Sequence, residues 1–120
     1  MSGIGLLEFY QDSGTVTKAN VKASAGRVRA IRFTNANAAA RFVQIHNKAT
    51  APAATETANL YFLIPAGTAA APGILDLEAP FFGDPGRYLS TGIGYAISTT
   101  ATTFTDAATA ADHTVAIVYS

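Results

Sequence analysis

The chain contains several short runs in which every second residue is large and apolar, and this period most constrains its fold. In residues 92–99 and 114–119, the alternate positions are Ile, Val or Tyr. Successive side chains of a strand point to opposite faces, so this period is typical of half-buried strands in antiparallel sheets. No window has a convincing helical period. We predict strands near residues 16–23, 27–35, 41–47, 60–64, 74–77, 92–99 and 114–119.

About seven short strands separated by turn residues predict an all-β fold. A single sheet would leave one apolar face uncovered, so we expect two antiparallel sheets packed as a sandwich, jelly-roll-like or immunoglobulin-like. The length of 120 residues is sufficient for one domain. We place that domain at residues 15–120, after an amino-terminal arm at residues 1–14. The strand order does not follow from these patterns.

Two predicted strands depart from simple alternation. In residues 27–35 the apolar phase shifts between Val28 and Ile31, which a β-bulge would explain. Residues 60–64, Leu-Tyr-Phe-Leu-Ile, are apolar at every position. Such a strand suits a place where both of its faces are covered, one by the core and the other by a loop or a neighbour.

Charged residues are sparse, at 13% of the chain against roughly 25% in typical domains. The eight basic and eight acidic residues balance, whereas binding to nucleic acid generally requires a basic excess. We expect no membrane helix and no secretory signal, because apolar runs are short and Glu8 interrupts the first one. A neutral, apolar chain without a bilayer partner indicates contacts between protein subunits. The alternative is that tolerated alanines alone raise the hydropathy.

Three long connections, at residues 49–59, 66–73 and 100–112, are rich in Ala or Thr and poor in charge. Flexible linkers are usually more polar, and long loops in compact domains are usually functional or disordered. We therefore expect these loops to be ordered and to pack against another flat protein surface.

Residues suited to catalysis are few, and we predict no enzyme, no catalytic or metal site and no cofactor. The chain has no Cys and only two histidines, His46 and His113, which suit hydrogen-bonding roles at strand ends. Asp76 and Glu78 would share a strand face, which more often forms a solvated edge than an acid–base pair. The Gly-x-Gly at residues 92–94 lacks the third glycine and the lysine of a phosphate loop.

Seven residues are candidates for contacts with other proteins. Five are aromatic residues in the arm, in a Pro-Phe-Phe-Gly segment and in a neutral loop, and two are arginines on one strand face. Buried aromatics dominate interface energetics, but a loop aromatic can equally fold onto its own core. The arginines suit an acidic partner surface, or else they form a solvated strand face. The candidates are Phe9, Tyr10, Arg27, Arg29, Phe81, Phe82 and Phe104.

Four segments resemble patterns in short virion proteins of tailed bacteriophages. They are residues 32–37 (Arg-Phe-Thr-Asn-Ala-Asn), 41–49 (Arg-Phe-Val-Gln-Ile-His-Asn-Lys-Ala), 90–99 and 115–119. The resemblance covers most of the chain after about Val21. It implies a β-sandwich decoration (cement) protein on the capsid surface, which contacts the major capsid protein and copies of itself. A trimer would suit threefold lattice positions. The patterns carry no residue-level motif, so no functional residue is transferred.

Other functions remain open at this point. Similar small sandwiches occur in tail and head-fibre components, so the location within a virion is not fixed. A carbohydrate-binding module would require exposed, coplanar aromatics such as Tyr61, Tyr88 or Tyr95 beside polar groups. An enzyme would require a deep pocket that holds His46 or His113 beside a carboxylate.

Overall fold

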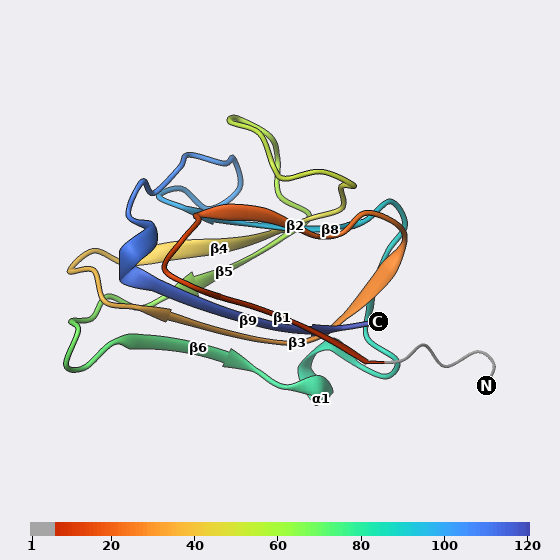
Figure 1. Cartoon of the computed structure of the whole chain (residues 1–120), viewed down its shortest axis with the longest axis horizontal. Coiled ribbons are helices and arrows are strands. Elements are labelled where there is room, and N and C mark those ends of the chain that lie inside the picture. The colour runs from red at the N-terminus through yellow and green to blue at the C-terminus, as the bar shows by residue number, and fades with distance from the viewer. Residues whose placement is uncertain (1–6) are drawn as a thin grey trace.

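The computed structural model describes residues 7–120, which form two antiparallel sheets packed face to face (Figure 1). The predicted all-β sandwich is confirmed, with nine strands instead of about seven. One sheet contains β1 (Glu8–Ser13), β3 (Gly26–Asn35), β6 (Gly73–Leu77), β7 (Arg87–Leu89) and β9 (His113–Tyr119). The other contains β2 (Lys18–Lys22), β4 (Arg41–His46), β5 (Leu60–Ile64) and β8 (Ile93–Ser98).

The strand order explains which strands are exposed at the sheet edges. The five-stranded sheet runs β1-β9-β3-β6, with β7 paired to β3 off this path. The four-stranded sheet runs β2-β8-β4-β5. Two short helical turns, α1 (Ala79–Phe82) and the 3-10 turn η1 (Ala110–Asp112), lie in the connections that precede β7 and β9.

Strand β1 occupies residues that we expected in an amino-terminal arm. It pairs with β9 over its whole length, from Glu8 opposite Tyr119 to Ser13 opposite Thr114. The segment gives a weak strand signal in the sequence, because only one of its faces is turned toward the core and most of its residues are polar. Residues 1–6 of the expected arm lie outside the described residues.

The predicted bulge in β3 is confirmed. Val28 pairs with Tyr119, and Ala30 pairs with the preceding residue of β9, so Arg29 is the additional residue. This insertion lets Val28 and Ile31 both face the core although they are three residues apart.

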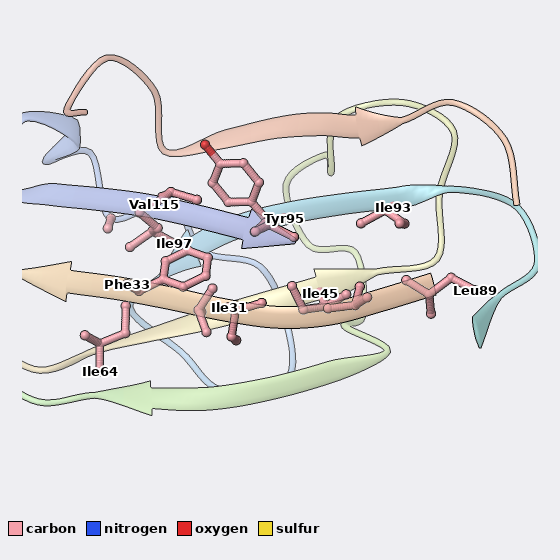
Figure 2. Packing of buried hydrophobic residues seen from close by; sticks show 13 residues of the cluster. Ile31, Phe33, Ile45, Ile64, Leu89, Ile93, Tyr95, Ile97 and Val115 are labelled. Atoms are coloured by element: carbon pink, nitrogen blue, oxygen red, sulfur yellow. The ribbon is translucent and has the colours of Figure 1, made fainter. Parts of the chain in front are cut away.

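The hydrophobic core lies between the two sheets, with residues of both facing one another (Figure 2). Phe33 and Tyr95 meet edge to face across it, with 5.9 Å between ring centroids. Tyr10 packs against Tyr95 from β1, and the two hydroxyl oxygens lie 3.2 Å apart. Complete burial of each large apolar side chain contributes roughly 1.5–3 kcal/mol. Strand β1 therefore packs against the core through Tyr10.

Two of the neutral loops cover the outer face of the four-stranded sheet, on the side away from the other sheet (Figure 1). The backbone N–H of Phe104 donates to Glu56 O at 2.9 Å, and the N–H of Thr55 donates to Phe104 O at 2.9 Å. The side chain of Phe104 is 1% exposed beneath them. These loops therefore pack first against their own sheet.

The prediction that a loop covers the second face of β5 is wrong for the described chain, and cover by a neighbour stays a prediction. Tyr61 is 48% exposed and Leu63 is 51% exposed, because β5 is an edge strand and the covering loops do not reach its outer face. Their cross-strand neighbours on that face, Gln44 and Phe42, lie on β4.

Candidate protein-interaction edge

Strand β5 differs in charge from every other strand at a sheet edge of the described chain. Natural edge strands are commonly protected by charged side chains, because their unpaired backbone groups would otherwise accept another strand. The sequence of β5 has no charged residue. The other edge strands carry Glu8 and Asp12 in β1, Lys18 and Lys22 in β2, Asp76 in β6 and Arg87 in β7.

On the outer face of β5, apolar side chains form a small patch. Tyr61 packs against Phe42 of β4, with ring centroids 6.4 Å apart and planes at 71°. Leu63 is directly opposite Phe42 in the β4–β5 register. Strand β5 therefore presents about half of two large side chains to the surroundings beside an unpaired backbone.

On the inner face of β5, a second set of aromatic side chains continues onto α1. Phe62 meets Phe81 at 5.6 Å and Phe82 at 6.2 Å between ring centroids, in both cases edge to face. A groove of about 250 Å³ lies here, lined by Leu60, Phe62, Phe81, Phe82 and Arg87. Phe81 is 58% exposed, whereas Phe82 packs partly against the core. We call β5 together with Phe81 and Phe82 the β5 edge.

The local sequence explains why the two phenylalanines diverge. Pro80 stands in the first turn of α1, where its missing N–H costs nothing, and Gly83 ends the turn at a φ of 78°. The chain here is therefore helical and not extended. Phe81 is exposed and Phe82 packs partly against the core, so the two adjacent rings do not both face it.

Arg27 and Arg29 support the turn that leads into β7. Arg29 donates to the carbonyl oxygen of Pro85 at 2.7 Å, and the Arg27 guanidinium lies 4.9 Å from the Tyr88 ring centroid. Arg27 also donates to Gly86 O at 3.4 Å. Both predicted contact arginines thus already have partners within the chain.

The predicted arm residues Phe9 and Tyr10 point to opposite faces of β1. Phe9 is 61% exposed and lies beside Val118 and Ala30, on the outer face of the five-stranded sheet. Tyr10 faces inward and bonds to Tyr95. Phe104, as described above, is buried under the chain's own loops. Of the aromatic candidates, Phe9 and Phe81 are therefore accessible, and they lie at different places.

The two histidines are buried and hydrogen-bonded. Nε2 of His46 donates to Oε1 of Gln44 at 2.9 Å, and Nδ1 of His113 donates to the carbonyl oxygen of Thr109 at 2.8 Å. Burial lowers the pKa of His46 and of His113 below its usual value. The hollows beside β1, β2, β5 and α1 are lined by other residues.

The carboxylates do not gather into a recognisable site. Asp76 forms an ion pair with Arg32 at 3.2 Å on the exposed sheet face, and so it has a cationic partner instead of a second acid. Within residues 7–120, no group of three His, Asp or Glu side chains is placed to hold a metal ion.

The tyrosines that a carbohydrate module would use are separated. Tyr95 lies in the core, Tyr61 lies on the four-stranded sheet and Tyr88 lies on β7 of the other sheet. Tyr61 also packs at a steep angle against Phe42. These three side chains do not form one flat sugar-stacking platform.

The residues that sequence reasoning missed as protein-contact candidates are Tyr61, Phe62 and Leu63, which form the centre of the β5 edge. Their signal was present in the sequence as an apolar strand without charge, but it was interpreted as a covered strand.

Comparison with known proteins gives no matching family model, no matching curated protein and no matching solved structure. No helix within residues 7–120 is long and apolar enough to cross a bilayer.

Proposed function

We propose that this chain is a structural protein of a larger assembly and that it binds other polypeptides through the β5 edge. The observation that carries the proposal is the absence of charge from β5, combined with the half-exposed side chains of Tyr61, Leu63 and Phe81. Water-exposed apolar groups beside an unpaired backbone favour protein contacts, because pairing buries the side chains and satisfies the backbone together.

The assembly that we propose is the virion of a tailed bacteriophage, with the chain as a capsid decoration protein. This part rests on the sequence resemblance in residues 32–37, 41–49, 90–99 and 115–119. A decoration protein acts by mass action: it binds the assembled shell and not the free subunits, and so stabilises the shell. A rigid sandwich whose loops are tied to its own sheet suits that role, since little order would be lost on binding.

Two further observations support binding over catalysis. The imidazoles of His46 and His113 are buried, and the lowered pKa of each keeps it neutral near pH 7. The one arginine–aspartate ion pair in the described residues, between Arg32 and Asp76, is on an open sheet face and lines a shallow hollow with Phe9. Neither arrangement places an acid and a base within a cleft.

The proposal is tested by fractionation of particles from the source that encodes the chain. An epitope-tagged wild-type copy and the variant Leu63→Glu are expressed there, and particles are separated on a density gradient. We expect the wild type with the particles and the variant in the slow fractions. Ile74→Glu, at an equally exposed apolar position on β6, is the matched control and should behave as the wild type. Wild-type protein found only in the slow fractions would refute the proposal.

A further inference from the structure

We propose that β5 pairs antiparallel with β5 of a second copy of this chain, about a twofold axis at Phe62. The two four-stranded sheets then become one continuous eight-stranded sheet. This inference rests on the proposed function and deepens it, because it names the first partner of the β5 edge. The known alternative use of such an edge is the addition of a strand from a different protein.

The distribution of charge among the edge strands carries the argument. A twofold contact presents the same surface on both sides, so each charge meets its own kind. In β2, pairing about Asn20 would place Lys18 opposite Lys22 of the other copy. In β1, pairing about Tyr10 would place Glu8 opposite Asp12. Like charges at directly opposed strand positions are destabilising, so these two edges oppose self-pairing.

Self-pairing of β5 places no like charges opposite one another. In the register centred on Phe62, that residue lies opposite its own copy, Tyr61 lies opposite Leu63, and Leu60 lies opposite Ile64. Each pair is apolar, and aromatic and aliphatic side chains opposite one another stabilise paired strands. Pro65 follows β5 directly and has no backbone N–H, so the pairing is limited to these five residues.

The surroundings of β5 extend the contact on both faces. On one face, Leu63 of the second copy would join the patch of Phe42 and Tyr61. On the other face, its Phe62 would lie beside the groove lined by Phe62 and Phe81. A contact of five residues a side is small, so we expect a weak dimer that forms at roughly ten to one hundred micromolar.

Sedimentation velocity of the full chain, from about 1 to 300 µM, tests this pairing. The wild type should shift from monomer to dimer with concentration. Leu63→Glu and Tyr61→Lys should each remain monomeric at the highest concentration, a loss of at least tenfold in association. The double variant Y61K/L63E should dimerise again, because the register places the two opposite charges across the axis from each other. Ile74→Glu is the control, and circular dichroism confirms that each variant is folded.

Several results would overturn the inference. A monomeric wild type at all concentrations, a dimer that L63E does not weaken, or a double variant that stays monomeric would each contradict it. A closed trimer would also contradict it, since a twofold strand pair cannot close a ring of three. Failure of the proposed function is distinguishable. If the wild type dimerises but never joins particles, the β5 pairing stands and the proposed function fails. If it stays monomeric but joins particles through Leu63, the proposed function stands and the pairing fails.

Discussion

The ring of Phe62 on β5 meets the ring of Phe81 on α1 edge to face, with 5.6 Å between centroids. This contact joins the uncharged edge strand to the exposed aromatic of the following connection. Phe81 is open to solvent, while its neighbour Phe82 packs partly on the core. Adjacent residues thus divide between the solvent and the margin of the core.

That division predicts unequal effects of two matched truncations. Phe81→Ala should lower the free energy of unfolding by about 0.5–1.5 kcal/mol, since it removes an exposed ring and its aromatic contacts. Phe82→Ala should cost more, about 2 kcal/mol or above, since it also leaves space beside the core. Urea unfolding of both variants measures the difference. Equal losses, or a larger loss for Phe81→Ala, would contradict this placement of the two rings.

The hydroxyl pair of Tyr10 and Tyr95 tests whether β1 is part of the folded core. Burial, and then the hydrogen bond with Tyr10, raise the pKa of Tyr95 far above its usual value, so this side chain stays protonated. Tyr10→Phe leaves the buried Tyr95 hydroxyl without its partner and should cost about 1–3 kcal/mol. Adding Tyr95→Phe should recover part of that loss. A double-mutant cycle with no coupling would indicate that β1 does not pack here.

Phe104 holds the two covering loops against the four-stranded sheet. The centroid of its ring lies 6.5 Å from that of the His46 ring, and its backbone forms hydrogen bonds with the backbone of Glu56 and Thr55 in the other loop. Phe104→Ala should destabilise the fold by about 3–5 kcal/mol, as expected for a buried ring. The exposed Thr102→Ala in the same loop is the control and should change stability by less than about 0.5 kcal/mol. Thermal unfolding that is unchanged in Phe104→Ala would show that the loop is not tied to the sheet.

Stability should decrease as the pH falls below about 6.5, the usual pKa of histidine. Burial lowers the pKa values of His46 and His113 in the folded state. As the pH falls, the unfolded chain therefore takes up protons at a higher pH than the folded chain does, and this shifts the equilibrium toward unfolding. Glu56 and Asp12, whose pKa values are also lowered, act only in the more acidic range below about 4.5.

Urea midpoints at pH 7.5, 6.0 and 5.0 measure this dependence. The wild-type midpoint should fall over that range, and the double variant H46N/H113N should show a much flatter profile. A wild-type midpoint that is constant between pH 7.5 and 5.0 would mean that the two imidazoles are not buried and neutral.

Much of the fold could be predicted from local pattern. Each of the seven predicted ranges matches a strand to within two residues at either end, and the phase shift between Val28 and Ile31 located the bulge at Arg29. Strand β1 was missed because its buried face has only one large apolar residue, Tyr10, among polar neighbours. Strand β7 was missed because three residues give no period. Strand order depends on contacts far apart in sequence, which local alternation does not encode.

The candidate surface was harder to predict, for a related reason. An apolar strand has the same sequence whether both faces are covered or one lies at an edge, so Tyr61 and Leu63 were assigned to the wrong environment. Phe104 has neutral neighbours that suit either a partner or its own sheet. The contrast between the uncharged β5 and the charged β1 and β2 becomes informative only once the sheet order identifies them as edges.

The most direct test of the account is amide hydrogen exchange in residues 60–64, measured for dilute free protein and for protein bound to its native particles. We predict that exchange in this segment slows by about tenfold or more on assembly, because paired backbone groups are protected. Residues 9–13 on the opposite sheet's edge should change little. Unchanged exchange at β5, with new protection around Phe9 and Val118 instead, would contradict the account.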